Sequence, residues 1–224
     1  MEKIDKLNEK YYHILKVIAQ KKGDEKHLRI TSGELASLTG MSQQNASRII
    51  LEMGNEGIID RKISGRHQDI SITETGLDIL YGEFAELSQI LGTGKSTSIS
   101  GIVQSGLGEG RYYVAKKPYL VQFSEKLEMI PYPGTLNVKV DNSDEKTLRH
   151  IRARKGILIE GFSSDDRTYG AVKAFRCSIK GVACALIFPY RSIYRDVMEI
   201  ISHIYLRETL NLKDGDSIEI KFDF

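Results

Sequence analysis

The chain has 224 residues, of which 41% are hydrophobic and 28% are charged, as is typical of a globular protein with one large domain or two small ones. Its formal net charge is only +2, so charge excludes a generally basic nucleic-acid-coating protein and any DNA binding must come from a local patch. The N-terminus lacks the apolar core of a signal peptide, no apolar run is long enough to span a membrane, and Cys177 and Cys184 form no CxxC pair. We therefore expect a cytoplasmic protein with reduced thiols and no membrane partner.

The N-terminal part of the chain follows the pattern of a helix-turn-helix. Apolar residues recur at helical spacing from Ile4 to Ile18 and predict a first helix. We expect Ser32 to cap a short helix over residues 33–38, Gly40 to make a turn, and Ser42 to cap a second helix. Two short helices joined by a turn that contains glycine form a helix-turn-helix.

A hairpin and a last helix follow the motif. Residues 58–63 and 69–73 are predicted to be strands on either side of a tight turn. A helix is expected to begin at Thr73 or Thr75 and to continue to Leu91. This order of elements, with the phrase ITETGLDIL after the hairpin, resembles the winged helix-turn-helix domains of MarR-like transcription regulators.

That resemblance implies a DNA-binding domain over residues 1–91, with the second helix of the motif in the major groove and the hairpin, or wing, on phosphates or in the minor groove. Amide side chains can read adenine, and arginine can read guanine or contact phosphate. The expected DNA contacts are Gln43, Gln44, Asn45, Ser47, Arg48, Arg61, Lys62 and Arg66. The alternative is a solvated polar face on a protein-interaction module. The first and last helices are apolar enough for a homodimer.

Residues 92–97, GTGKST, look like the end of the phosphate-binding P-loop G-x-x-x-x-G-K-[ST]. The first glycine of that motif would be residue 89, which is Gln89 at the end of a predicted helix. No strand precedes the stretch, and the residues after it resemble a strand rather than a helix. We therefore predict a flexible linker over residues 92–98 and a second domain over residues 99–224.

The second domain is predicted to be rich in short strands. With one or two helices among them, such strands favour a β-barrel over a doubly wound sheet. The expected strands are residues 99–103, 112–114, 119–123, 136–140, 156–161, 170–177, 182–188 and 217–222.

Two stretches of this domain suggest binding chemistry. In SGLGEGR, residues 105–111, alternating glycines can expose successive backbone N–H groups to an anion; the alternative is a glycine-rich hairpin turn between two strands. In PYPGTLNVK, Thr135 and Asn137 are two residues apart on a strand and face the same side. Their neutral oxygens suit Mg²⁺, which takes its remaining ligands from water and phosphate; the alternative is an ordinary amphipathic strand after a turn.

Three separated motifs, GLGEGRYYV, PYPGTLNVKV and RSIYRDVMEIISHIYLRETLNLKDGDSIEI, resemble the archaeal CTP-dependent riboflavin kinases, some of which carry an N-terminal winged helix. The resemblance covers residues 99–224. It implies an α+β protein of two domains, a winged helix-turn-helix followed by a six-stranded cradle-loop β-barrel. It also implies transfer of a phosphoryl group from CTP to riboflavin, giving FMN and CDP.

The resemblance also implies roles for individual residues. The nucleotide phosphate loop would be Gly106, Leu107, Gly108, Glu109, Gly110 and Arg111, and the segment that meets cytosine would be Ile204, Tyr205, Leu206 and Arg207. Thr135 and Asn137 would bind Mg²⁺. Glu199 would lie at the flavin and could orient or deprotonate its hydroxyl, although the residues alone favour a surface charge on a helix over 196–202. Either Arg191 or Ser192 would stand at the flavin phosphate.

The leading hypothesis is therefore a riboflavin kinase fused to a transcription-regulator domain. The alternative is a regulator that senses flavin or nucleotide without catalysis. The presence of both Thr135 and Asn137 favours the enzyme.

Overall fold

The computed structural model describes residues 2–23, 25–106, 108–164, 167–190 and 196–224, without the side chains of residues 2–10 and of Glu109. The chain divides into two compact units, Met1–Leu87 and Ser88–Phe224. Among the helices of the described residues, none combines the length and apolar character needed to cross a membrane.

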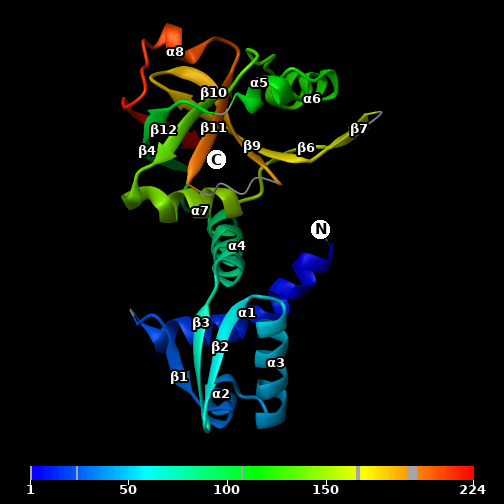
Figure 1. The fold of residues 1–224 in the computed structure, drawn as a ribbon, viewed down its shortest axis with the longest axis vertical. Helices are drawn as coiled ribbons and strands as arrows, with labels where there is room; N and C mark the ends of the chain where they lie inside the picture. The colour runs from blue at the N-terminus through cyan, green and yellow to red at the C-terminus, as the bar shows by residue number, and fades with distance from the viewer. Residues whose placement is uncertain (1, 24, 107, 165–166, 191–195) are drawn as a thin grey trace. The chain divides into compact units, whose positions relative to one another are not determined.

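The first unit is a winged helix-turn-helix, as predicted. Its elements are α1 (Glu2–Lys22), β1 (Leu28–Ile30), α2 (Ser32–Thr39), α3 (Gln43–Asn55), β2 (Ile59–Ser64), β3 (His67–Ile72) and α4 (Glu74–Ile90) (Figure 1). The strands form an antiparallel sheet in the order β1-β3-β2. Strand β1 was not predicted, because three residues carry too little pattern to be recognised.

Local capping fixes the two helices of the motif. Thr31, rather than the predicted Ser32, caps α2: its hydroxyl accepts a hydrogen bond from the Glu34 N–H (3.1 Å), and the Glu34 carboxylate accepts one from the Thr31 N–H (2.7 Å). This reciprocal pair is a capping box, which a serine at the next position cannot make. Gly40 ends α2 with φ 68°, and Ser42 caps α3 by accepting from the Asn45 N–H at 3.3 Å.

A closed barrel forms most of the second unit. Its elements are β4 (Ser96–Gln104), α5 (Glu109–Val114), α6 (Lys117–Leu127), β5 (Leu136–Val140), the 3₁₀ turn Asn142–Asp144, α7 (Glu145–Ala153), β6 (Ile157–Ile159), β7 (Phe162–Ser164), β8 (Arg167–Tyr169), β9 (Val172–Ile179), β10 (Val182–Pro189), β11 (Val197–Ser202), α8 (Leu206–Thr209) and β12 (Ser217–Asp223). Strands β10, β11, β5, β4, β12 and β9 follow one another, and the β9–β10 pairing closes the ring. These six antiparallel strands confirm the predicted barrel, and β6 extends it beside β9 (Figure 1).

The barrel interior holds an apolar core. Alternate residues of β5 and β12, such as Val138 and Ile220, are fully buried in it. Cys177 and Cys184 lie opposite each other on β9 and β10, both buried and both free thiols. Burial raises the pKa of Cys184 to about 11 and raises the pKa of Cys177 as well.

Two predicted strands, residues 112–114 and 119–123, are helical instead, in α5 and α6. In α6 a proline occupies the first turn, where its missing N–H costs nothing. Tyr119, Phe123 and Leu127 then recur every four residues and are all buried, so they lie on one helical face. A helix therefore follows the glycine loop, where a strand was expected.

Two other expectations were also wrong. Residues 196–202 were expected to be helical, but β11 occupies Val197–Ser202, because Met198 and Ile200 point into the barrel core while Ile201 packs on the opposite side. The predicted linker over residues 92–98 overlaps β4, which begins at Ser96. Pairing of Ser96 with Asp223 and of Thr97 with Phe222 draws these residues into the sheet.

Candidate active site

A cavity of about 340 Å³ opens on the barrel beside the start of β5. Three segments that are far apart in the sequence line it: the glycine loop, the turn that leads into β5, and the end of β11 with α8. Its lining residues are Gly106, Gly108, Gly110, Arg111, Tyr132, Pro133, Gly134, Thr135, Leu136, Asn137, Ile200, Ser202, Ile204, Tyr205, Leu206 and Arg207. The fold thus brings together most of the residues that the sequence suggested for nucleotide and metal.

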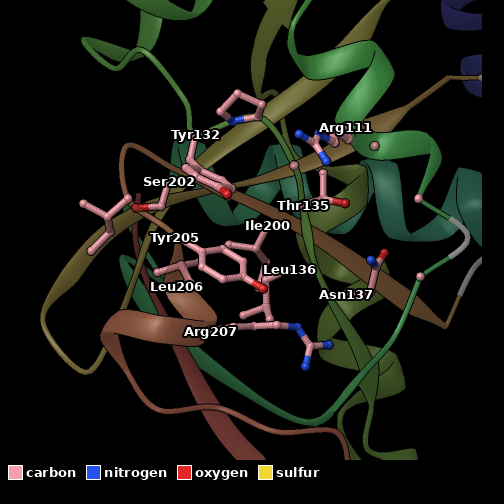
Figure 2. A pocket seen from close by; sticks show the side chains of 16 residues that line it. Arg111, Tyr132, Thr135, Leu136, Asn137, Ile200, Ser202, Tyr205, Leu206 and Arg207 are labelled. Carbon is pink, nitrogen blue, oxygen red and sulfur yellow. The ribbon is translucent and has the colours of Figure 1, made fainter.

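Thr135 and Asn137 lie on one side of the strand, as their spacing predicts, and both are half-buried. Figure 2 shows their side chains pointing the same way, toward the segment that carries the glycines. The alternating residues Leu136 and Val138 are buried in the barrel core. The strand therefore presents a hydroxyl and an amide to the cavity while its other face anchors it.

The glycine loop lies directly against these two polar side chains. A Cβ atom on Gly106 would stand 2.2 Å from Asn137 Nδ2, and one on Gly110 would stand 2.3 Å from Thr135 Oγ1. Real Cβ atoms do not approach other atoms so closely, so both positions require glycine for close approach. Gly108 has a different reason to be glycine, since its φ is +80° with open space around it.

Aromatic side chains line the opposite wall of the cavity. The rings of Tyr132 and Tyr205 stack with centroids 5.0 Å apart and planes 26° apart, as Figure 2 shows. Tyr132 is held by its N–H, which donates to the Ser202 carbonyl at 2.8 Å. Both tyrosines are about two-fifths exposed (43% each) and line the cavity, so a flat ligand can reach them.

Two arginines supply positive charge at the cavity. Arg111, in α5, is exposed, whereas Arg207 is half-buried and donates to the Gln104 carbonyl at 2.9 Å. In the described residues no group of three or more His, Cys, Asp or Glu side chains could hold a metal ion. Metal binding here would depend on neutral oxygens with ligand phosphates.

Glu199 is near the cavity but does not line it. It is half-buried on β11, where it pairs directly with Asn137 of β5, and directly opposed residues share a face of the sheet. Of the remaining candidates, Leu107, Arg191 and Ser192 lie outside the described residues. The main chain of Glu109 begins α5.

Two tyrosines of the glycine-loop motif pack away from the cavity. The Tyr112 and Tyr169 hydroxyls are 3.0 Å apart, and Lys116 Nζ lies 3.8 Å from the centre of the Tyr112 ring. The nearby ammonium of Lys116, and then the Tyr169 hydroxyl, lower the pKa of Tyr112. Tyr113 packs edge-on against Tyr169. This cluster supports α5 from the side of the β7–β8 hairpin.

The predicted DNA contacts occupy α3 and the wing. On α3, Gln43, Gln44 and Arg48 are exposed, while Asn45 and Ser47 are half-buried. Arg48 donates to Asn45 Oδ1 at 2.9 Å and pairs with Glu52 on the next turn.

The wing carries the remaining predicted contacts. Lys62 and Arg66 are exposed near its tip, and Arg61 is half-buried on β2. Gly65 has φ 63° and makes the turn between the strands. Lys62 lies directly opposite Asp69 in the register of the hairpin, so a carboxylate is close to part of the wing's positive charge.

Sequence reasoning did not assign several residues that shape the cavity. The sequence contains 11 tyrosines, and nothing in its pattern marked Tyr132 as a cavity residue. Ser202 is buried, and its hydroxyl donates to the Ala183 carbonyl at 2.8 Å, which holds the end of β11. The Ile204–Arg207 segment, which contains Tyr205, is the part of this wall that the sequence motifs indicated.

Comparison with known proteins gives two family matches. A model for CTP-dependent riboflavin kinases, described as "Domain of unknown function DUF120", matches residues 103–222. A model described as "Crp-like helix-turn-helix domain" matches residues 12–75. The second match agrees with the predicted fold, although the sequence had suggested a MarR-like relative.

Whole-chain relatives are similar over nearly the full length. A riboflavin kinase of Thermoplasma volcanium is 51% identical over 214 residues, which cover 96% of this chain and 97% of the relative. One of Thermoplasma acidophilum is 50% identical with the same coverage. One of Archaeoglobus fulgidus is 43% identical over 209 residues, 93% of this chain and 90% of the relative.

Proposed function

The chain belongs to the family of CTP-dependent riboflavin kinases, and we propose that it transfers the γ-phosphoryl group of CTP to the 5′-hydroxyl of riboflavin, giving FMN and CDP. One observation carries the proposal beyond the family match. A single cavity collects the glycine loop, the Thr135–Asn137 pair and the Ile204–Arg207 segment from three separated motifs. We assign the kinase to residues 99–224 and the regulator domain to residues 1–91.

The glycine loop would hold the phosphates of CTP. Phosphoryl transfer depends mainly on positioning and on neutralising charge. Gly106, Gly108 and Gly110 leave the backbone accessible at the cavity, and Arg111 adds a positive charge beside them. The neighbouring Ile204–Arg207 segment would face the cytosine, with the Tyr132 and Tyr205 rings available for stacking.

Thr135 and Asn137 fit a magnesium ion. Their oxygens are neutral, lie on one side of the chain where it enters β5 and are close to the proposed phosphate loop, so the phosphates would supply the negative ligands. A bound Mg²⁺ neutralises charge on the phosphate oxygens and helps to orient them. The tight contact of both side chains with glycines limits their rotation, which pre-organises the pair.

Riboflavin would approach from the side of Glu199. Because Glu199 and Asn137 are directly opposed on neighbouring strands, a flavin hydroxyl at Glu199 would be close to a phosphate held at Asn137. The hydroxyl oxygen attacks the γ-phosphorus, the bond to the β–γ bridging oxygen breaks, and CDP leaves with that electron pair. We propose that the Glu199 carboxylate accepts the hydroxyl proton. Arg191 and Ser192 remain the candidates for the phosphate of FMN.

We further propose that the winged helix-turn-helix binds DNA through α3 and the wing. The exposed Gln43, Gln44 and Arg48 have the chemistry to read base edges, and Lys62 and Arg66 have the charge to contact phosphates. A homodimer and a cytoplasmic location, both expected from the sequence, remain predictions; the reduced, buried state of both cysteines is compatible with the latter.

The kinase is tested by incubating the purified chain with riboflavin, Mg²⁺ and one of CTP, ATP, GTP or UTP, and measuring FMN by chromatography. We expect the fastest FMN formation with CTP. Asn137→Ala and Thr135→Ala should each lower the rate by about 100-fold, because even outer partners of bound metals contribute 10–100-fold. Lys139→Ala is the matched control, since Lys139 is exposed on the same face of β5 outside the cavity.

The outcomes separate the hypotheses. If FMN forms equally fast from ATP, the riboflavin kinase activity stands but the preference for CTP as phosphate donor is rejected. No FMN from any nucleotide, together with measurable binding of riboflavin, would reject the enzyme and favour a regulator that senses flavin without catalysis.

A further inference from the structure

The turn between α8 and β12 is attached firmly to the end of β4. The Gly215 N–H donates to the Val103 carbonyl at 2.9 Å, and the Val103 N–H donates to the Asp216 carbonyl at 2.8 Å. Inside the turn, the Lys213 N–H donates to the Asp216 carboxylate at 2.7 Å. These bonds fix the main chain on either side of Asp214.

The Asp214 carboxylate joins two segments that are distant in the sequence. Its Oδ2 accepts a hydrogen bond from the Ser105 hydroxyl at 2.5 Å, and its Oδ1 accepts one from Arg207 Nη2 at 2.7 Å. The same Arg207 nitrogen donates to the Gln104 carbonyl at 2.9 Å. A closed network therefore links the end of β4, the turn and α8.

This network adjoins the cavity through Arg207. Ser105 immediately precedes Gly106, the first glycine of the loop, and Arg207 is the last residue of the segment from Ile204 that lines the opposite side. We infer that Asp214 is a positioning residue that sets the spacing between the phosphate loop and the base-binding segment. This inference rests on the proposed function, because it assumes that the two segments hold one nucleotide.

Charge and exposure favour positioning over a contribution to stability. The Arg207 and Asp214 side chains are 24% and 51% exposed, and ion pairs at such sites add little to folding stability. The Ser105 hydroxyl and then the Arg207 guanidinium lower the pKa of Asp214, so the carboxylate is ionised at neutral pH. Hydrogen bonds to an ionised group are shorter and stronger than neutral ones, which suits a group that holds two segments at a fixed spacing.

The test compares Asp214→Asn with wild type in steady-state FMN formation and in calorimetric binding of CDP. We expect the KM for CTP and the Kd for CDP to rise about tenfold, as the loss of one charge-assisted hydrogen bond implies, with the KM for riboflavin unchanged. Asp214→Glu, which keeps the charge, should recover part of the loss. An unchanged Kd for CDP in Asp214→Asn overturns the inference.

Asp216→Asn is the matched control, because the Asp216 carboxylate stabilises the same turn through the Lys213 N–H, whereas Asp214 is the carboxylate that bonds Ser105 and Arg207. Equal effects of the two asparagine variants would show that turn stability alone matters and would overturn the inference. If Asp214→Asn fails to fold, Ser105→Ala removes one of the two side-chain hydrogen bonds to Asp214 and should still weaken CDP binding several-fold. If the wild-type protein makes no FMN and binds no CDP, the proposed function itself is rejected. If the wild-type protein is active and the variants bind CDP equally well, only the positioning role is rejected.

Discussion

Replacing Gly106 with alanine tests the geometry of the candidate site. The added Cβ would stand 2.2 Å from Asn137 Nδ2 and 2.8 Å from its Cγ, whereas ordinary contacts begin near 3.4 Å. The Asn137 side chain must therefore move by about 1 Å, a displacement that can lower the rate about 100-fold when it affects a reacting group. The backbone of Gly106 does not require glycine, since its φ lies outside the left-handed region, so the fold should persist.

The assay is kcat/KM for FMN formation as a function of Mg²⁺ concentration, with thermal unfolding measured in parallel. We expect kcat/KM to fall by about 100-fold, equivalent to ~2.7 kcal/mol, and half-maximal activity to need more Mg²⁺. Gly82→Ala is the control, because a Cβ there meets nothing within 4 Å. Activity of Gly106→Ala within threefold of wild type, at an unchanged Mg²⁺ requirement, would refute the argument that Asn137 is a metal ligand held by the loop.

Three further predictions concern the base-binding wall, the wing and the barrel core. Tyr132→Ala should raise the KM for CTP about tenfold, since stacking on one ring contributes about 1–3 kcal/mol, and Tyr132→Phe should restore it; equal KM values in all three proteins would exclude stacking. Lys62→Ala and Arg66→Ala should each reduce the slope of log Kobs against log salt for a random duplex by about 1, as fluorescence anisotropy can measure; unchanged slopes would remove the wing from the interface. Burial raises the pKa of Cys184 from 9.0 to about 11, so the Cys184 thiol loses its proton at a higher pH in the folded state than in the unfolded state. The free energy of unfolding should therefore decline from pH 9 to 11. In thermal unfolding, Cys184→Val should make that decline shallower, while the part due to Cys177 remains; an identical decline in both proteins would contradict the prediction.

The sequence was sufficient wherever a motif combined spacing with local chemistry. Thr135 and Asn137 were placed on one face because a strand alternates, and the structure has them there. The helix-turn-helix followed from its caps and turn, and only the identity of the α2 cap was wrong by one position. These features depend on neighbours within a few residues.

The sequence failed where tertiary contacts decide the structure. The run Val197–Ser202 carries apolar residues on both faces, because Met198 and Ile200 join the barrel core and Ile201 meets a second cluster. With Glu199 between them, these residues do not alternate clearly between apolar and polar, as a half-exposed strand would. The segment with Tyr112 and Tyr113 was too short to reveal its period. Asp214 precedes a glycine and reads only as a turn, because its partners Ser105 and Arg207 are separated from it in the sequence.

The most direct test of the central claim follows the fate of one phosphoryl group. The purified chain is incubated with riboflavin, Mg²⁺ and CTP labelled with ³²P at the γ position, and the products are separated and counted. We expect label in FMN in an amount equal to the CDP formed. Label that remains in CTP, or that is released only as inorganic phosphate, would contradict it.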